Sequence, residues 1–292
     1  MRSYPADYEL VSPGNLDAVL HLMRDEAGQW TPLAGGTEIM VQFGAGRLAA
    51  RNLVNIGSLP ELREIVETDA ALSIGGGCTF SQIRADARVQ QHFPMLARCA
   101  SWTGSIANQN RATLAGNIAN ASPAADSPPA LFAYGAEIEL ISAGGTRPLP
   151  YEHFHLGYKK TAIAPDELIY RVHLSKKFAG ALSFVRKVGT RNAQAISKIC
   201  VAATARLEAG SFRELRIGMG SVAPAPVRLT GTEQALLGRD IDAASIADAR
   251  TALLREIAPI DDIRSTAEYR RLVAANLIEE MLHTFAAAGA HA

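Results

Sequence analysis

The chain has 292 residues, and its 29 Lys and Arg balance its 29 Asp and Glu, so the formal net charge is zero. A neutral chain gives no electrostatic reason to expect nucleic acid or an anionic membrane as a partner. Hydrophobic residues make up 48% of the sequence and aromatic residues only 6%, as is typical of an α/β protein with an aliphatic core. No apolar run approaches the roughly 18 residues of a membrane-spanning helix, and the N-terminus resembles no export signal. We therefore expect a cytoplasmic location.

Cysteine and histidine give no metal-binding pattern. Cys78, Cys99 and Cys200 form no Cys-x-x-Cys pair, which argues against a zinc ribbon or an iron–sulfur cluster on this chain. His153 and His155 have the spacing of one strand face, but no third ligand lies nearby, so no metal site is predicted. The sequence also lacks a nucleophile elbow, a Walker loop and a His-Glu-x-x-His pattern, and no catalytic residue is assigned.

Hydrophobic periodicity indicates alternating helices and strands over the first 180 residues. Residues 16–23 carry apolar side chains at the spacing of one helix face. In chain order, the other expected elements are a strand at 31–34, a helix at 38–43, strands at 52–56 and 71–74, a helix from Thr79, a helix at 94–102, a helix from Pro128, a hairpin of 137–142 and 146–149, and a strand at 169–174.

Beyond about residue 180 the pattern changes to longer elements with few glycines and prolines near the end. We expect a strand at 182–188, a hairpin of 199–208 and 212–219, and helices at 245–257 and 266–288. The chain is therefore predicted to be α+β, with one domain at 1–178, in lobes of about 1–57 and 58–178, and a smaller domain at 179–292.

Two glycine-bearing stretches about eighty residues apart carry the clearest chemical signal. They are Leu33-Ala-Gly-Gly-Thr-Glu-Ile-Met40 and Thr113-Leu-Ala-Gly-Asn-Ile-Ala-Asn-Ala-Ser-Pro-Ala-Ala-Asp126. Because glycine lacks a Cβ, backbone N–H groups in such turns approach and donate to phosphate oxygens. Thr37 is also expected to cap the helix that follows the first loop. Two such loops in one domain predict a site that grips a dinucleotide from two sides.

Two other glycine patterns need a separate interpretation. Gly44-Ala-Gly-Arg-Leu-Ala49 matches the Gly-x-Gly-x-x-Ala fingerprint of a Rossmann dinucleotide site. The strand expected at 52–56 leaves about five residues for a helix that needs ten or more, so we interpret this segment as a helix end and a loop. Gly75-Gly-Gly77 is either a cofactor contact or a flexible connection between strand and helix.

At the two glycine loops the chain resembles the FAD-binding subunit of the molybdenum hydroxylases, which is the medium chain of the xanthine, carbon monoxide and nicotinate dehydrogenase type. The resemblance runs from about Tyr4 to about Ala288, and the second stretch is its most specific part. It implies a two-lobed FAD-binding module of the vanillyl-alcohol-oxidase (PCMH) type, followed by a smaller α+β C-terminal domain.

The resemblance also implies which residues contact FAD. Relatives often carry a second glycine where this chain has Ala115, and Thr103 stands where some relatives place an aromatic ring over the flavin, so ring stacking is not carried over to it. The implied contacts are Leu33, Ala34, Gly35, Gly36, Thr37, Glu38 and Ile39 in the first loop, Thr113, Leu114, Ala115, Gly116, Asn117, Asn120, Ser122 and Asp126 in the second, and the single residues Ile169 and Lys187.

Several of these assignments leave alternatives open. Asp126 either holds a cofactor hydroxyl or caps the helix that Pro128 opens. Lys187 either lies near the flavin, where a cation favours the reduced ring, or is a solvated lysine at a strand end. The loop of residues 189–198 resembles the family loop beside the flavin, and its Arg191 is a candidate to assist a phosphate-bearing acceptor.

On this resemblance the expected function is electron transfer within a multi-subunit molybdenum hydroxylase. Electrons from a molybdopterin centre on a large subunit would cross iron–sulfur clusters on a small subunit and reach FAD on this chain, which would pass them to an acceptor such as NAD. The expected assembly is a heterohexamer with two copies of each chain. The alternative is a self-contained FAD-dependent reductase or oxidase of the same fold, acting on its own small substrate. A scaffold that has lost the cofactor is disfavoured because both glycine loops are intact.

Overall fold

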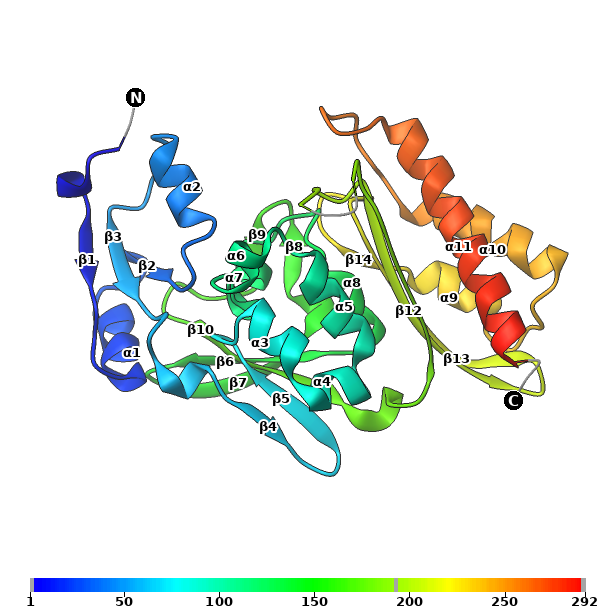
Figure 1. Cartoon of the computed structure of the whole chain (residues 1–292), viewed down its shortest axis with the longest axis horizontal. Coiled ribbons are helices and arrows are strands. Elements are labelled where there is room, and N and C mark those ends of the chain that lie inside the picture. Colours follow the sequence, from blue (N-terminus) through cyan, green and yellow to red (C-terminus); the bar gives the residue numbers. More distant parts are fainter. Residues whose placement is uncertain (1–2, 192–193, 290–292) are drawn as a thin grey trace.

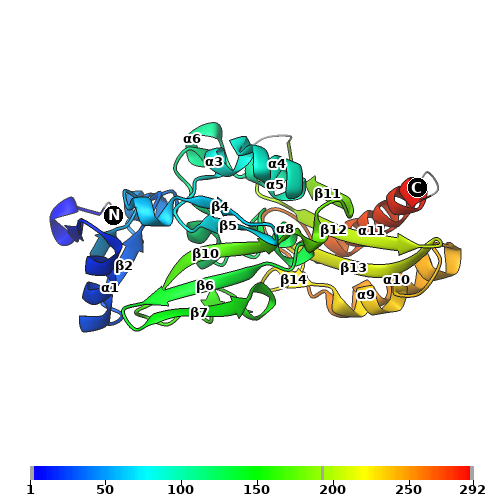
Figure 2. The ribbon, with the colours of Figure 1, turned by 90° about the horizontal axis from the view of Figure 1, so that it is seen from below.

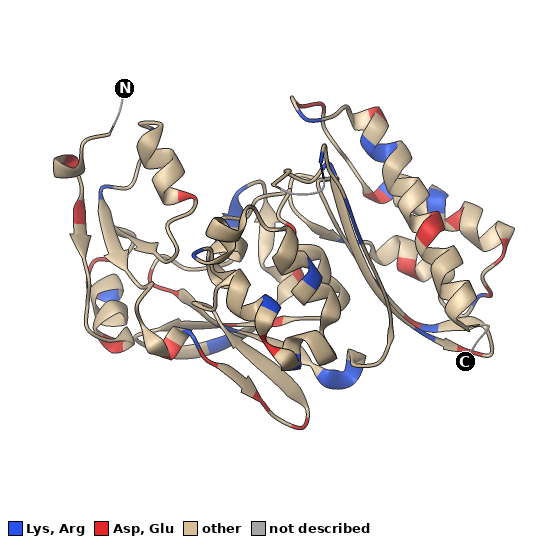
Figure 3. Ribbon diagram, viewed as in Figure 1, with Lys and Arg blue, Asp and Glu red and all other residues tan. Residues whose placement is uncertain are grey.

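Three main sheets follow one another along the chain and lie side by side along the long axis of the molecule (Figure 1). The computed structural model describes residues 3–191 and 194–289. Charged residues of both signs are spread over all three parts (Figure 3), in keeping with the zero net charge. Within the described ranges, no helix is both long enough and apolar enough to cross a bilayer.

The first lobe is built on a small parallel sheet. Its elements are a 3-10 turn at Pro5–Asp7, β1 Glu9–Val11, α1 Leu16–Asp25, β2 Trp30–Leu33, α2 Ile39–Gly44 and β3 Asn52–Asn55. The strand order is β1-β3-β2. Helix α1 begins where the Asn15 side chain accepts a hydrogen bond from the Ala18 N–H at 2.9 Å. The apolar face of α1 then packs against Trp30 and Val54 of the sheet.

The second lobe forms the centre of the molecule around an antiparallel sheet. Its elements are a 3-10 turn at Pro60–Leu62, β4 Ile65–Glu67, β5 Ala71–Gly75, α3 Phe80–Ala85, α4 Ala87–His92, α5 Pro94–Trp102, α6 Ile106–Gln109, α7 Leu114–Ala119, α8 Pro128–Ala133, β6 Glu137–Ser142, β7 Gly145–Pro150, a 3-10 turn at Tyr151–His153, β8 His155–Gly157, β9 Lys160–Thr161 and β10 Leu168–Ser175. The strand order is β4-β5-β10-β6-β7, and β8 pairs with β9 separately. Helices α3, α4 and α5 lie on one face of the five-stranded sheet (Figure 2).

The third part combines an antiparallel sheet with three helices. Its elements are a 3-10 turn at Lys176–Phe178, β11 Leu182–Val188, β12 Ile199–Glu208, β13 Ser211–Gly220, β14 Val227–Arg228, α9 Thr230–Leu236, α10 Ala243–Glu256 and α11 Ala267–Gly289. The strands follow the order β11-β12-β13-β14. Helices α9, α10 and α11 cover one face of this sheet (Figure 1), and α8 of the second lobe packs against β12 and β13.

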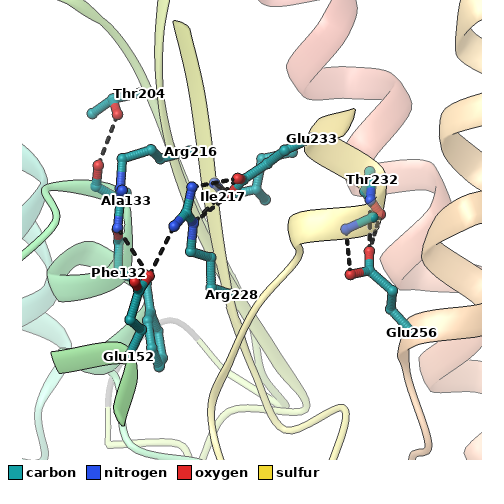
Figure 4. A network of polar contacts seen from close by, with 11 residues as sticks. Phe132, Ala133, Glu152, Thr204, Arg216, Ile217, Arg228, Thr232, Glu233 and Glu256 are labelled. Atoms are coloured by element: carbon teal, nitrogen blue, oxygen red, sulfur yellow. Dashed lines mark hydrogen bonds and ion pairs between the residues drawn. The ribbon is translucent and has the colours of Figure 1, made fainter. Parts of the chain in front are cut away.

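An ion-pair network holds the third part against the second lobe (Figure 4). Glu152, just after β7, accepts hydrogen bonds from Arg228 at 2.8 Å and from Arg216 at 3.5 Å. Arg228 also pairs with the buried carboxylate of Glu233 at 2.7 Å. Gly218 of β13 allows the close packing of α8, because a Cβ there would lie 2.3 Å from a backbone carbonyl of α8. These contacts fix the orientation of the two parts, which is needed for a site that both of them line.

Most of the expected elements are present with the same or nearly the same bounds. Helix α5 and strands β11 and β12 begin and end where the sequence predicts. The expectation for the two histidines was wrong: His153 ends a 3-10 turn and only His155 lies in strand β8, so the two do not share a strand face. The segment 44–49 is the end of α2 followed by a loop, in which Gly46 has a φ of 65°. It opens no helix, in agreement with the interpretation that it is not a Rossmann fingerprint.

Candidate cofactor site

Two cavities meet between the three parts of the molecule. The inner cavity, of about 620 Å³, lies between the two lobes and contains residues of both glycine loops. The outer cavity, of about 1020 Å³, lies between the second lobe and the third part. The two form one continuous cleft because they share the lining residues Glu38, Thr103, Gly104, Asn108, Asn117 and Asn120.

The first glycine loop brings unpaired backbone donors to the inner cavity. Gly36 has a φ of 75°, in the left-handed region that glycine adopts without strain. The N–H groups of residues 35–39 donate to no acceptor within the described part of the chain, although the Gly36 carbonyl accepts from the Met40 N–H at 2.9 Å. A row of free N–H groups beside a cavity is an arrangement that binds phosphate oxygens.

Gly35 is required because the first glycine loop touches the segment just before the second one. A Cβ at Gly35 would lie 1.8 Å from the carbonyl oxygen of Arg111, and the Arg111 Nε–H donates to the Gly35 carbonyl at 3.1 Å. The expected cap at Thr37 was wrong. Helix α2 instead has Glu38 as its N-cap, whose backbone is already in the helical region and whose side chain makes no capping hydrogen bond.

The second loop is held against β5 and its following turn. Thr113 caps α7 by accepting a hydrogen bond from the Gly116 N–H at 3.1 Å, so that N–H is satisfied within the loop. Ala115 fits because it faces Gly76, where an added Cβ would come within 2.9 Å of the Ala115 Cβ. A Cβ at Gly76 would also lie 2.3 Å from the Ile169 carbonyl. Close packing, rather than a flexible connection, therefore explains this glycine, and Gly76 lines the inner cavity.

Two asparagines stand where the cavities join. The Asn117 Oδ1 accepts a hydrogen bond from the Ser127 hydroxyl at 2.7 Å, and the Asn120 Oδ1 accepts one from the Lys159 ammonium at 2.8 Å. Because the oxygen of each amide is engaged, its –NH₂ group is left to donate. The junction therefore offers neutral donors to oxygen atoms of a ligand.

Asp126 is a buried carboxylate that lines the outer cavity. The Lys187 ammonium donates to its Oδ2 at 2.6 Å and the Ser197 hydroxyl to its Oδ1 at 2.5 Å. Burial raises the pKa of Asp126 above its ordinary value, and the charge of Lys187 and these two hydrogen bonds partly offset that rise. Each carboxylate oxygen keeps capacity to accept one further hydrogen bond.

Both simpler alternatives for this pair are excluded. The N-cap of α8 is Ser127, which makes no side-chain capping hydrogen bond, so Asp126 does not serve as a helix cap. The side chain of Lys187 is only 10% exposed and also donates to the Trp102 carbonyl at 3.1 Å, so it is not a solvated lysine. Lys187 contacts the lining residue Asp126 but does not itself line either cavity.

A chain of hydrogen bonds leads from Asp126 into the third part. The Ser197 carbonyl accepts from the Ser221 hydroxyl at 3.0 Å, and the Ser221 carbonyl accepts from Arg270 at 2.9 Å. Arg270 pairs with Asp262 at 2.8 Å. Ser221 has a φ of 67°, and its N–H donates to a carbonyl of the second glycine loop. These residues line the outer cavity. Ser197 lies in the loop of residues 189–198 that the resemblance placed beside the flavin, but it was given no role; Ser221, Asp262 and Arg270 were missed because isolated polar residues match no motif.

The structure brings most of the predicted contact residues to the cleft. Leu33, Leu114 and Lys187 are exceptions that line neither cavity; Leu114 is fully buried in the core, and Lys187 contacts the lining residue Asp126. Arg191 donates to the Gln194 carbonyl at 2.5 Å, and its neighbour Asn192 lies outside the described residues. The predicted residues that line the cleft are Ala34, Gly35, Gly36, Thr37, Glu38, Ile39, Thr113, Ala115, Gly116, Asn117, Asn120, Ser122, Asp126 and Ile169.

The chemistry of the cleft fits FAD. The free N–H groups of residues 35–39 suit a diphosphate, and the amides of Asn117 and Asn120 suit the oxygens beyond it. Asp126 is an acceptor for a hydroxyl or a ring N–H. In the parts of the chain that the structure describes, no group of three or more His, Cys, Asp or Glu side chains is arranged to hold a metal ion.

Comparison with known families gives two matches that together span most of the chain. Residues 6–176 match the family described as the FAD binding domain in molybdopterin dehydrogenase. Residues 184–285 match the CO dehydrogenase flavoprotein C-terminal domain. The first match contains both glycine loops, and the second contains Lys187, Ser197 and Ser221.

Individual relatives agree with these matches. The chain is 34% identical over 242 residues to the xanthine dehydrogenase FAD-binding subunit of Escherichia coli O157:H7, covering 82% of each chain. It is 24% identical to the carbon monoxide dehydrogenase medium chain of Hydrogenophaga pseudoflava, covering 96% of this chain and 97% of that one. The solved carbon monoxide dehydrogenase from Hydrogenophaga pseudoflava superposes with a TM-score of 0.90 at 25% identity, covering 95% and 96%. The quinoline 2-oxidoreductase of Pseudomonas putida 86 has the same fold, with a TM-score of 0.89 at 22% identity and 99% coverage of each chain.

The superposition confirms the expected fold class, a PCMH-type FAD-binding module followed by a smaller C-terminal α+β domain. The same matches identify the cofactor as FAD and the class of protein as an oxidoreductase subunit. The chain therefore belongs to the family of FAD-binding subunits of the molybdopterin dehydrogenases.

Proposed function

We propose that this chain carries FAD in a multi-subunit molybdenum hydroxylase and passes electrons from iron–sulfur clusters on a small subunit to NAD. The large subunit would hold the molybdopterin centre, where substrate is hydroxylated. The observation that best supports the proposal is the row of free N–H groups at residues 35–39 beside a cleft that both glycine loops line. When bound, the flavin supplies reversible two-electron chemistry.

In this proposal the residues of the chain hold the cofactor and set its surroundings. The N–H groups from Gly35 to Ile39 donate to the diphosphate. The amides of Asn117 and Asn120 donate further along the cleft, and Asp126 accepts from a cofactor hydroxyl. Lys187 offsets the negative charge of Asp126, so that the outer cavity presents a neutral pair to the flavin. The predicted contacts Thr113, Ala115, Gly116, Ser122 and Ile169 would shape the wall behind these groups.

The domain division that we propose falls between residues 178 and 179, after the last 3-10 turn and before β11. Residues 1–178 would then supply the two glycine loops, and residues 179–292 would supply Lys187 and Ser197. The Glu152–Arg228 pair joins the two units at 2.8 Å. Because Asp126 takes hydrogen bonds from both Lys187 and Ser197, the flavin end of the site would be complete only when the two units are docked.

The placement of the cofactor is tested by a charge introduced into the first loop. Gly36→Glu would put a carboxylate beside the diphosphate and would force a non-glycine residue to adopt a φ of 75°. Gly14→Glu is the matched control, since an added Cβ there meets nothing within 4 Å and the residue lines neither cavity. We expect Gly36→Glu to lose most of its flavin absorbance while Gly14→Glu retains it, with far-ultraviolet circular dichroism confirming that both are folded. Full flavin content in a folded Gly36→Glu variant would refute the placement.

The place in a larger complex is tested by co-purification and turnover. A tagged chain is expected to retain an iron–sulfur and a molybdenum subunit from its native host. The isolated FAD-loaded chain is expected to oxidise NADH slowly with artificial acceptors and to turn over no purine, aldehyde or N-heterocycle. Substrate-dependent turnover by the isolated chain would instead identify a self-contained flavoenzyme.

A further inference from the structure

One solvent-exposed aromatic side chain lines the cleft. Among the described residues that line either cavity, Tyr158 is the only aromatic one, and it lines the outer cavity. Its side chain is 65% exposed. Thr103, the position at which a ring was considered from the sequence, lies at the junction of the cavities and offers no ring. A planar ligand in the outer cavity therefore has a single side chain on which to stack.

The backbone fixes the position of Tyr158. It occupies the tip of the β8–β9 hairpin, where Gly157 pairs with Lys160 across the turn. The next residue, Lys159, has a φ of 55°, a conformation that a lysine adopts only when its surroundings impose it. Lys159 is anchored by its hydrogen bond to Asn120 at 2.8 Å. Since Asn120 lines both cavities, the hairpin tip is tied to the junction where the cofactor site begins.

The surroundings of Tyr158 favour an apolar ligand that arrives from solvent. Ile196 and Ile260 also line the outer cavity and are 52% and 66% exposed, so its lining includes three large, solvent-exposed side chains of mainly apolar character. Each cavity alone is within or near the range of about 300–1,000 Å³ typical of a single small-molecule site. The cleft therefore has room for a second planar molecule beside a dinucleotide. An exposed ring suits a ligand that exchanges better than it suits a resident cofactor.

We propose that Tyr158 is the stacking platform for the planar ring of the electron acceptor and thereby selects aromatic or quinonoid acceptors over compact ionic ones. This inference rests on the proposed electron-transfer function. Tyr158 binds and orients the acceptor and takes no part in the transfer. To NAD, whose nicotinamide is a planar ring, the reduced flavin gives a hydride and releases one proton; to a quinone probe it gives two electrons and two protons, which form the hydroquinone. A stacked aromatic pair contributes enough to change affinity about five-fold.

The experiment compares three variants of the full chain loaded with FAD. Tyr158→Leu removes the ring, Tyr158→Phe keeps it, and Tyr4→Leu is the matched control, because Tyr4 is 71% exposed and lines neither cavity. The affinity of the oxidised protein for menadione, a planar quinone, is measured by calorimetry. The photoreduced protein is then mixed anaerobically with menadione or with ferricyanide, and flavin reoxidation is followed by stopped flow. Flavin content, flavin fluorescence and midpoint potential are recorded for each variant.

We expect Tyr158→Leu to weaken menadione binding about five-fold and to raise the half-saturating menadione concentration by the same factor. Ferricyanide reoxidation, flavin fluorescence and midpoint potential should stay unchanged, and Tyr158→Phe and Tyr4→Leu should behave as the unmodified chain does. Unaltered menadione affinity in Tyr158→Leu would overturn the inference. So would a change in flavin fluorescence alone, which would place the ring against the flavin. A folded chain that binds no FAD would overturn the proposed electron-transfer function, an outcome visible before any acceptor is added.

Discussion

Lys187→Met tests whether Asp126 and Lys187 stabilise the fold as a coupled, buried ion pair. Methionine keeps much of the length of the side chain and removes its charge. At 2.6 Å and an effective dielectric constant of about 20, the bare attraction within the pair is about 6 kcal/mol. Desolvation of both groups offsets much of this, but removal of one partner leaves an uncompensated buried charge, which costs about 3–5 kcal/mol. We expect Lys187→Met to lose that much stability in denaturant unfolding at pH 8.

The dependence on pH has a definite sign. Burial raises the pKa of Asp126 and Lys187 opposes that rise, so the pKa of Asp126 should rise further in Lys187→Met. The native variant then holds a proton that the unfolded chain has released. Its stability therefore falls as pH increases through the interval between the ordinary aspartate pKa and the raised one. The deficit relative to the unmodified chain should be largest at alkaline pH and should shrink toward pH 5.

A second substitution provides the control. The double variant Lys187→Met with Asp126→Asn removes both charges and keeps an acceptor for the Ser197 hydroxyl, which lies 2.5 Å from the Asp126 carboxylate. It should recover about 2 kcal/mol or more relative to Lys187→Met, a coupling measured by a double-mutant cycle. The flavin midpoint potential of Lys187→Met should fall by about 30 mV, equivalent to about 1.4 kcal/mol for two electrons, at a pH where Asp126 is ionised. Equal stabilities at pH 8 and no coupling between the two substitutions would refute the reasoning.

Three further predictions concern other parts of the chain. Gly35→Ala should abolish FAD binding and lower the free energy of unfolding by more than about 2 kcal/mol, the cost of a severe packing clash, because its Cβ would overlap a backbone carbonyl. Gly44→Ala is the control, since its Cβ meets nothing within 4 Å, and it should leave flavin titration and thermal melting unchanged. Burial lowers the pKa of His155 to about 4. Between about pH 6.5 and 4 the unfolded chain therefore binds a proton that the folded chain does not, and stability is lost as the pH falls through that window. In His155→Gln, the difference in stability between pH 7.5 and pH 4.5, measured by thermal melting, should be smaller by roughly 2 kcal/mol. Glu152→Gln should weaken the pairing with Arg228 by about 1 kcal/mol and so lower the melting temperature without changing FAD content. An unchanged melting temperature would mean that the packing of the third part against the second lobe does not depend on the Glu152 carboxylate.

Local sequence patterns predicted the longer helices and strands because each of these is long enough to show the periodicity of its apolar face. Helix α5 opens at Pro94, and strand β12 runs from Ile199 to Glu208, both as expected. Strands of two or three residues, such as β9 Lys160–Thr161 and β14 Val227–Arg228, were not predicted. So short a segment shows no periodicity, and its pairing is decided by a neighbour elsewhere in the chain. The hairpin that carries Tyr158 belongs to this unpredictable class.

The candidate site divides in the same way. Each glycine loop is one continuous stretch of sequence, and the two were predicted to form a single site together. Lys187 and Asp126 are 61 residues apart, and each was considered separately, as a solvated lysine or a helix cap among other roles. Their actual relation is a buried ion pair, which no local pattern contains. Ser221 and Arg270, and the role of Ser197 within its predicted loop, were missed for the same reason, because only the tertiary fold joins these residues into a chain of hydrogen bonds that ends at Asp126.

The sequence argument gives the adjacent glycines of the first loop one role, and the structure gives them two. Gly36 adopts a φ of 75° and leaves its N–H free beside the inner cavity, which is the role that the motif predicts. Gly35 is fixed by the carbonyl of Arg111, 1.8 Å from where its Cβ would lie. The first glycine thus lets the first loop pack against the segment that leads into the second, and the second glycine presents the donors. A dinucleotide site between two lobes needs both conditions, because the free N–H groups of the first loop and the side-chain amides of the second can contact one ligand only when the two segments are held together.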